Sequence, residues 1–389
     1  MSTTMIAGSS PITRLTSQCG SEAELVTRLV SSVAEDGLDV DRAWIVNCYV
    51  AMKSRPLTIL AGPQRSGKEL LVTSLTRLLA RGTWQSQTML GHAWWAEGTE
   101  NAALFTEAQV RLNSNKILTL IEQASLPKNA DRVFIGWLNR IGPTELAGFF
   151  SELAFQLHHK RLMRLPSFHL TEAIAWPPNF CLIGTIDTLP IGRSNDDLFS
   201  EAMIIPWPAA AVRPPTGRHT VAPILPVTEP VFLRSCIRSE EAAFDKLHRT
   251  QGWQPQFMWP LVVVEQLLRQ YGVALPDCAM GGAMIYVANA WSAVGQGLFD
   301  PTPGRNLAIA LDFALTQSLL LPAGEAIHGS PALHARLTGA ISMKFPRSAA
   351  FLGALRPTLA HHQTPRREPV TAQNLSAATM RQPAVAHSG

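Results

Sequence analysis

The chain has 389 residues, 46% of them hydrophobic and only 16% charged, so it can bury a large core and is not disordered throughout. Its 33 basic and 29 acidic residues are nearly balanced, which gives no indication of nucleic-acid binding. The start has no basic segment followed by an apolar one, and the most apolar window, residues 272–297, is interrupted by Pro276, Asp277 and Asn289. We therefore expect a soluble cytoplasmic protein without a secretory signal or a membrane span.

Residues 1–20 are rich in Ser, Thr and Gly and have no periodicity, which predicts a flexible N-terminal arm. From Ser21 onward the apolar residues recur at helical spacing, and Glu24 completes a capping box, so a helix is expected to begin there. A second helix is predicted over residues 41–53. The short apolar run 57–61 then predicts a buried strand, because strands of a parallel sheet are apolar on both faces.

Helices and strands continue to alternate up to residue 205. Further helices are predicted over residues 68–79, 104–124 and 145–157, and further buried strands over residues 133–135 and 180–183. This alternation predicts an α/β core with a largely parallel sheet over residues 21–205.

The second half of the chain has a different pattern. Residues 206–230 contain seven prolines and predict a linker. Helical spacing follows over residues 239–250, 260–271, 282–294 and 307–319, which predicts an α-helical lid over residues 231–355. The polar tail, residues 356–389, is expected to be disordered.

One motif carries a specific chemistry. The sequence GPQRSGK, residues 62–68, matches G-x-x-x-x-G-K and lies between a predicted strand and a predicted helix, as a phosphate-binding loop requires. Its glycines let backbone N–H groups turn toward an anion at the helix N-terminus, and its lysine reaches the phosphates. A strand-to-helix turn that binds nothing is the alternative interpretation. The candidate nucleotide-binding residues are Gly62, Pro63, Gln64, Arg65, Ser66, Gly67, Lys68 and Glu69.

Two features argue against hydrolysis. The residue after Lys68 should carry a hydroxyl that binds Mg²⁺, but it is Glu69, which places a negative charge beside a polyanion. The second strand should end in an acidic pair that holds Mg²⁺ and orients water, but Gly136 and Trp137 follow it, and neither does this chemistry. We expect Trp137 to fill the vacated hydrolysis site.

The motif and its flanks resemble the AAA+ module of McrB-like ATPases, a family that includes the GTPase subunits of modified-cytosine restriction systems. The similarity spans residues 40–325 discontinuously. Its motifs are YVAMK at 49–53, PLTILAG at 56–62, Leu138-Asn139, GTID at 184–187, FSEA at 199–202, and ALD at 310–312 leading through Gln317 and Leu321-Pro322 to Gly324. The resemblance implies a P-loop NTPase core of three layers with a largely parallel sheet, followed by the helical lid.

The resemblance also implies ring-type assembly, with copies of the same chain or with an active AAA+ subunit, ATP or GTP as the ligand, and a setting in restriction or phage defence. Its functional positions are altered here. Asp187 stands where the family has a sensor asparagine, and an ionised carboxylate cannot donate a hydrogen bond to a phosphate. Glu201 stands where the family has an arginine that acts on a neighbouring subunit, which reverses the charge.

We therefore interpret the chain as a catalytically impaired AAA+ protein, in which Mg²⁺ binding is disfavoured, that acts as a structural or regulatory subunit. An active but divergent hydrolase is the first alternative, with Asp131 and Glu145 as the only obvious replacement carboxylates. An interaction module without nucleotide binding is the second alternative.

No other catalytic or metal site is predicted. The histidine pairs 158–159 and 361–362 lack acidic or cysteine residues at ligand spacing. The cysteines are scattered without a C-x-x-C pair, as in a cytosolic protein with reduced thiols. They are Cys19, Cys48, Cys181, Cys236 and Cys278.

Overall fold

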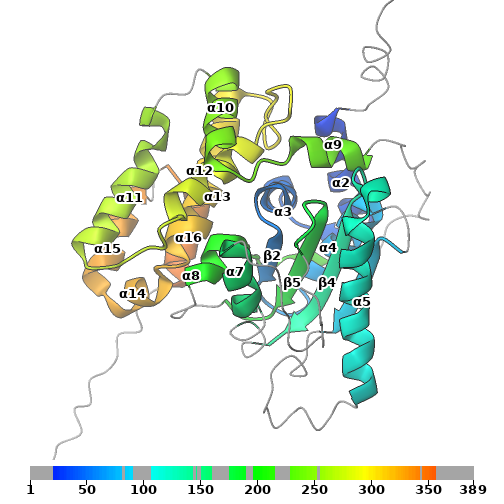
Figure 1. The fold of residues 1–389 in the computed structure, drawn as a ribbon. Helices are drawn as coiled ribbons and strands as arrows, with labels where there is room; N and C mark the ends of the chain where they lie inside the picture. Colours follow the sequence, from blue (N-terminus) through cyan, green and yellow to red (C-terminus); the bar gives the residue numbers. More distant parts are fainter. Residues whose placement is uncertain are drawn as a thin grey trace, which may run out of the picture. The chain divides into compact units, whose positions relative to one another are not determined.

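The computed structural model describes residues 21–80, 84–90, 107–142, 146, 150–159, 175–189, 196–214, 228–251, 255–341 and 344–355, all of which belong to the unit Met1–Pro357 (Figure 1). The predicted arm, the predicted tail and residues 215–227 of the predicted linker lie outside the described residues.

A five-stranded parallel sheet forms the centre of the α/β part, which confirms the predicted fold class at this level. The strands run in the order β3-β4-β5-β2-β6. Their bounds are Leu57–Ala61 for β2, Ser86–Leu90 for β3, Phe134–Ile141 for β4, Phe180–Ile186 for β5 and Ala202–Pro206 for β6. Every residue of β2 and β5 is buried, as their continuous apolar sequence predicts.

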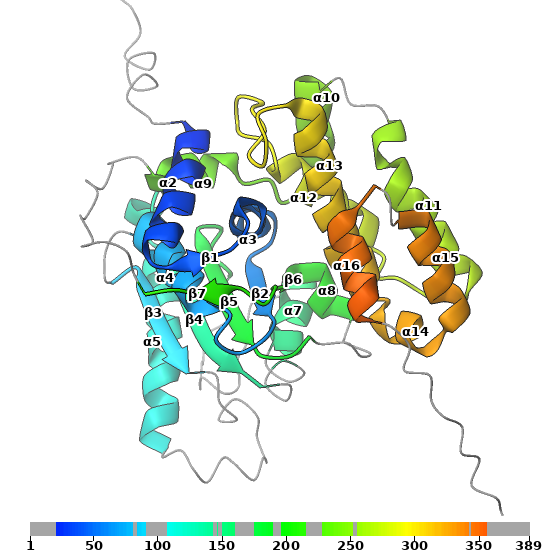
Figure 2. The same cartoon turned by 180° about the vertical axis from the view of Figure 1, so that it is seen from behind.

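Helices cover both faces of this sheet. Because parallel crossovers are right-handed, the connection from β2 to β3 runs over one face, and the later connections, which run the opposite way, cover the other. Accordingly, α5 (Glu107–Ser125) and α7 (Ser151–His158) lie on the side facing the viewer in Figure 1, whereas α2 (Glu22–Glu35) and α4 (Lys68–Leu79) face the viewer in Figure 2. Another helix of this part is α8 (Asp196–Glu201).

Two helices precede the sheet. The first, α2 (Glu22–Glu35), begins with the predicted capping box, in which Ser21 and Glu24 each accept a hydrogen bond from the other's backbone N–H. The second is α3 (Arg42–Ser54). The short strands β1 (Leu38–Asp39) and β7 (Ala211–Val212) pair antiparallel, so β7 lies within the sequence predicted as a linker.

The rest of the described chain is helical. The helices are α9 (Thr228–Ser235), α10 (Glu240–Gln251), α11 (Trp259–Gln270), α12 (Ala279–Asn289), α13 (Pro303–Ala314), the π-helical turn η7 (Leu315–Leu320), α14 (Gly324–Gly329), α15 (Pro331–Ile341) and α16 (Pro346–Ala354), with 3-10 turns η3 (Pro127–Asn129) and η6 (Pro255–Met258). Among the described residues, no helix is both long and apolar enough to cross a membrane.

Two predicted helices in this part have the wrong bounds. The helix predicted over residues 282–294 is α12, which ends at Asn289, because Trp291 turns back to form a bridge with Gly297. The helix predicted over residues 307–319 is α13, which begins four residues earlier and changes to the π-helical turn after Ala314. Hydrophobic spacing does not reveal either change.

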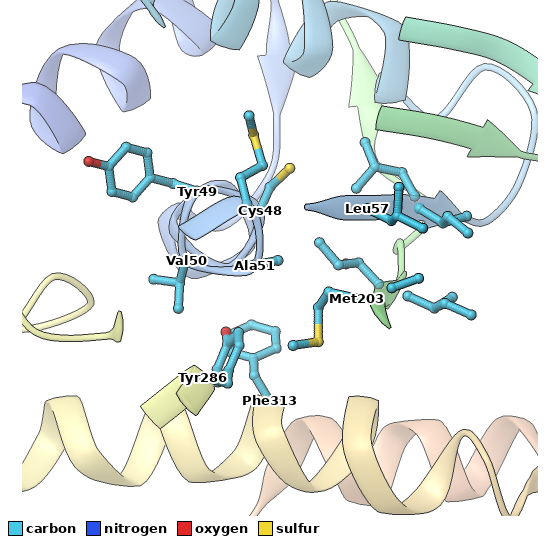
Figure 3. Close-up of a cluster of buried hydrophobic side chains, with 14 of the residues drawn as sticks. Cys48, Tyr49, Val50, Ala51, Leu57, Met203, Tyr286 and Phe313 are labelled. Atoms are coloured by element: carbon cyan, nitrogen blue, oxygen red, sulfur yellow. The ribbon is translucent and has the colours of Figure 1, made fainter. Parts of the chain in front are cut away.

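Helix α3 lies between the sheet and the C-terminal helices. Every residue from Ile45 to Ser54 is buried. Figure 3 shows α3 with Leu57 and Met203, from the strands, on one side and Tyr286 and Phe313, from the helices, on another. The helix therefore has no solvent-facing stripe, and its polar side chains must find partners inside the protein.

The largest of these polar side chains is Lys53, which is fully buried. Its ammonium donates to Glu22 Oε1 at 2.6 Å and to the carbonyl oxygen of Asn289 at 3.0 Å. Ser235 also donates to Glu22 Oε1, at 3.0 Å. The buried ion pair thus joins α2, α3, the end of α9 and the end of α12. Removing one partner of such a pair costs about 3–5 kcal/mol, because a buried charge is left uncompensated.

A second lysine lies beside this pair. Lys246 of α10 donates to the carbonyl oxygen of Trp291 at 2.6 Å. Burial, together with the charge of Lys53, lowers the pKa of Lys246 to about 7, although Glu22 and Cys236 act in the opposite direction. Above pH 7 the folded protein holds Lys246 neutral, whereas the unfolded chain keeps this lysine protonated up to its ordinary pKa of 10.5.

We therefore expect Lys246→Met to flatten the pH dependence of stability. The unfolded state of the wild type binds the extra proton above pH 7, so the free energy of unfolding rises with pH, by at most about 1.4 kcal/mol per unit. The check is urea denaturation of both proteins between pH 7 and 8. Nearer the ordinary thiol pKa of 9.0, the unfolded chain would lose a proton that the folded protein keeps on buried Cys48, whose pKa burial raises to about 12, and this would add an opposing slope.

The exposed Lys344 provides the matched control, because Lys344→Met removes a solvated ammonium from the surface. This variant should retain the wild-type slope. Equal slopes for Lys246→Met and the wild type would contradict the assignment.

Candidate functional site

The loop of residues 62–67 opens at the carboxyl edge of the sheet. It connects β2, which ends at Ala61, to α4, which begins at Lys68. Strand β2 lies between β5 and β6, and the connections from β2 and from β5 leave in opposite directions along the sheet. Such a reversal leaves a crevice at the carboxyl ends of the strands, where open parallel sheets bind their ligands.

The backbone of the loop has the geometry expected from its glycines. Gly67 adopts φ +81° as the N-cap of α4, and Arg65 adopts φ 57°. A Cβ atom on Gly67 would lie 2.1 Å from Cδ1 of Leu38, and a Cβ atom on Gly62 would lie 2.3 Å from the carbonyl oxygen of Trp207. Both positions therefore require glycine for reasons of local packing.

The side chain of Lys68 turns back into the loop. Its ammonium donates to the carbonyl oxygens of Gly62 and Pro63, the latter at 2.8 Å. It also forms an ion pair with Asp187 Oδ1 at 3.2 Å. Burial lowers the pKa of Lys68, whereas the hydrogen bond and charge of Asp187 act in the opposite direction. The loop thus holds a cation that already has an anionic partner.

Asp187 follows β5 directly and has two partners in the loop. Besides Lys68, it accepts a hydrogen bond at 2.8 Å from Nε2 of Gln64 through its second carboxylate oxygen. One-third of its side chain is exposed. The carboxylate therefore makes the contacts with the lysine and the loop that an incoming phosphate group would make.

The predicted end of the second strand is wrong. Strand β4 continues from Phe134 to Ile141, six residues beyond the predicted end at Ile135. Gly136 pairs with Leu182, which in turn pairs with Leu57, the first residue of β2. The proposed positions of the acidic pair therefore lie inside the sheet, on the level where β2 begins.

Like Gly136, Trp137 lies away from the loop, near the level at which β2 begins. It pairs with Ile183, which pairs with Thr58, so three residues, about 10 Å of strand, separate this level from Ala61. Its side chain is half-buried and packs against the core, and its buried indole N–H has no partner among the described residues. The register gives no support to the expectation that Trp137 fills a hydrolysis site.

The residues of β4 at the carboxyl end of the sheet, where the loop begins, are Asn139 and Arg140. The pairing of β4 with β5 is irregular between Leu138 and Ile141, and Arg140 has φ 60° there. The hydroxyl of Thr185 donates to Asn139 Oδ1 and accepts from the backbone N–H of Arg140, both at 3.0 Å. Such irregularities redirect side chains at the ends of strands.

Arg140 was missed by sequence reasoning. Its Nε lies 3.5 Å from Oε1 of Glu69, the residue after the loop lysine. The only sequence signal was its place directly after Leu138-Asn139. The structure thus brings an arginine beside the position at which the P-loop motif has a hydroxyl that binds Mg²⁺.

The other predicted positions do not meet at the loop. Glu201 ends α8, and its Oε1 lies 3.3 Å from Nδ1 of His158. Asp131 precedes β4, at the edge of the sheet opposite the loop, so it cannot replace the missing acid. Glu145 and the histidine pair 361–362 lie outside the described residues.

The residues present do not fit Mg²⁺. Glu69 faces the Arg140 guanidinium, whose charge repels a divalent cation, and Asn139 Oδ1 already accepts from Thr185. Across the described part of the chain, no group of three His, Cys, Asp or Glu residues could hold a metal ion. The four described cysteines, Cys48, Cys181, Cys236 and Cys278, are free thiols, as their spacing predicts.

The loop is also fixed to the core behind it. The indole of Trp207, directly after β6, donates to the carbonyl oxygen of Ser66 at 2.8 Å. Its ring packs edge-on against Trp44 of α3, with centroids 6.3 Å apart, and Trp44 packs in the same way against Phe313 at 5.0 Å. Aromatic packing therefore connects the loop to α3 and to α13.

No protein-family model and no curated protein matches the chain. A function must therefore be inferred from the geometry of the site itself.

We expect Gly67→Ala to lower the free energy of unfolding by about 1–3 kcal/mol, because alanine is strained at this φ and its methyl group would collide with Leu38. Gly304→Ala is the matched control, since Gly304 lies in the first turn of α13 with no neighbouring atom within 4 Å of its Cβ position. Chemical denaturation measures both changes. A neutral Gly67→Ala would mean that the loop does not hold this conformation.

Proposed function

We propose that this chain is an AAA+ P-loop protein that binds the phosphates of ATP or GTP through Lys68 without Mg²⁺, and that does not hydrolyse them. In this proposal it serves as a structural or regulatory subunit of an oligomer, with copies of itself or with an active AAA+ subunit, in a restriction or defence complex. The observation that supports it best is the ammonium of Lys68, held in a strand-loop-helix at the carboxyl edge of a parallel sheet and paired with Asp187.

Nucleotide binding is supported by three features of the loop. It lies at the reversal point of the sheet, it ends at the N-terminus of the twelve-residue helix α4, and its lysine is fixed in place. Helix N-termini attract phosphate because their backbone N–H groups are unpaired and the helix dipole is positive there.

The absence of hydrolysis is supported by the charges around the loop. Glu69, at the position where the P-loop motif has its Mg²⁺-binding hydroxyl, is paired with Arg140, and neither Gly136 nor Trp137 can orient a water molecule. The guanidinium of Arg140 can offset phosphate charge, as a metal would, but it does not generate a nucleophile.

Assembly as an AAA+ subunit rests on the McrB-like motifs together with the α/β core and the helices after residue 230. Helix α3 contacts both the sheet of the α/β core and the C-terminal helix α12, which is compatible with a lid built on the core. Isothermal titration calorimetry measures nucleotide binding, and a measurement of molecular size with and without nucleotide tests assembly.

The first test is calorimetry with ATP and GTP, in EDTA and in Mg²⁺, on the wild type and Lys68→Ala. We expect at least one nucleotide to bind in EDTA, and Lys68→Ala to weaken binding about tenfold or more, because a charge-assisted contact to phosphate is lost. Lys344→Ala removes an exposed lysine elsewhere and should bind as the wild type does.

Two outcomes would contradict the proposal. Mg²⁺-dependent turnover that Lys68→Ala abolishes would identify an active hydrolase. No binding of either nucleotide by the wild type would leave an interaction module, with the loop as a turn that binds nothing.

The second test concerns Asp187. An incoming phosphate must displace its carboxylate from Lys68 or bind beside it, and like charges about 4 Å apart repel by about 1–4 kcal/mol. We therefore expect Asp187→Asn to tighten nucleotide binding about tenfold, because it removes this repulsion and supplies a hydrogen-bond donor.

Asp277→Asn makes the same change of charge at an exposed position before α12 and should leave the affinity unchanged. If Asp187→Asn binds nucleotide no better than the wild type, the carboxylate does not compete with phosphate.

A further inference from the structure

A second polar site lies at the amino ends of the strands, whereas the loop of residues 62–67 lies at their carboxyl ends. A surface pocket of about 450 Å³ is lined by Trp84, Gln123, Lys128, Asn129 and Arg132. Trp84 precedes β3 and Arg132 precedes β4, so the pocket opens at the amino ends of two parallel strands. The phosphate loop follows the carboxyl end of β2, and the two sites are therefore separate.

The indole of Trp84 forms one wall of the pocket. It packs edge-on against the buried ring of Phe134, with centroids 5.4 Å apart, and the guanidinium of Arg132 lies over the indole at 5.3 Å. The side chain nevertheless remains 42% exposed. A large aromatic ring is thus held in a fixed orientation with part of its surface open to solvent.

The rest of the lining is basic and amide-bearing. Lys128 and Arg132 contribute two positive charges, no carboxylate lines the pocket, and neither cation forms an ion pair within the described part of the chain. Such a wall attracts anions.

The turn that carries these cations is held rigidly. Nδ2 of Asn129 donates to the carbonyl oxygen of Gln123 at 2.8 Å. Nδ2 of Asn179 donates to the carbonyl oxygens of Asn129, at 2.9 Å, and Arg132, at 3.0 Å. The backbone between the two basic residues is therefore ordered before any ligand arrives, which lowers the entropic cost of binding.

We propose that this pocket binds a nucleotide unit, with its base stacked on Trp84 and its phosphate held by Lys128 and Arg132. Aromatic side chains stack on any base, arginine and lysine bind phosphate, and the pocket volume suits a ligand of this size. The unit can come from a free nucleotide or from single-stranded nucleic acid, which present the same chemistry. This inference does not depend on the function proposed for the loop.

The test uses the full chain carrying Lys68→Ala, so that binding at the phosphate loop does not contribute. Calorimetry with adenosine monophosphate and with a short oligodeoxyadenylate measures binding to this parent and to Trp84→Ala and Arg132→Gln added to it. We expect each added substitution to weaken binding about tenfold or more, because stacking or phosphate contact is lost.

Trp259→Ala is the matched control, since Trp259 at the start of α11 is more exposed than Trp84 and lies in another part of the chain. It should leave the affinity unchanged. Circular dichroism melting checks that each variant is folded, and Arg132→Gln tests the site without altering the contact between Trp84 and Phe134.

The outcomes separate clearly. Tighter binding of the oligonucleotide than of the monophosphate identifies single-stranded nucleic acid as the source, and equal binding identifies the free nucleotide. The proposal is overturned if the parent binds neither probe at millimolar concentration, if Trp84→Ala binds as well as the parent, or if inorganic phosphate binds as tightly as adenosine monophosphate.

Discussion

The burial of α3 on every side is the constraint on which the rest of the structure depends. A helix with no solvent-facing stripe must find partners for its polar side chains internally, and α3 finds most of them across long sequence separations, although Nδ2 of Asn47 has no partner among the described residues. Lys53 is paired with Glu22 and donates to the carbonyl oxygen of Asn289, and Asn47 accepts from Tyr286 and Gln317. Because a buried unpaired charge is so costly, α2, α3 and α12 are held together as one unit. The C-terminal helices are therefore part of the same core as the sheet.

This core also holds the loop. Helix α3 leads directly into β2, and β2 into the loop, so the buried helix determines where the loop lysine stands. From the other side, Trp207 donates to the carbonyl oxygen of Ser66 and packs on Trp44 of α3. Trp44 in turn packs on Phe313, whose ring lies under the guanidinium of Arg347 at 4.8 Å. The loop backbone thus shares its supports with the junction between the α/β part and the C-terminal helices, and a ligand that moves the loop would act on packing that both parts share.

The sequence correctly predicts the features that depend on local residue patterns. The apolar run before Gly62 and the helical spacing after Lys68 predicted β2, the loop and α4 close to their observed bounds, and the capping box predicted the start of α2. Sequence reasoning failed where the outcome depends on pairing between distant segments. The length of β4 and the irregularity that redirects Arg140 come from its register with β5, which no local spacing reveals. The pocket around Trp84 joins residues up to 48 positions apart, so no single motif could indicate it.

The structure also changes how the altered positions are understood. Considered along the sequence, Glu69 and Asp187 are separate departures from the expected motifs, yet each has a cationic partner in the fold, Arg140 and Lys68 respectively. Both members of the Glu69–Arg140 pair are more than half exposed, so the pair contributes little to stability, and its effect is to set the charge beside the loop. The Lys68–Asp187 and Glu69–Arg140 pairs are each balanced without either nucleotide or Mg²⁺. An anion that binds Lys68 would have to displace Asp187, and a metal ion that binds Glu69 would have to displace Arg140.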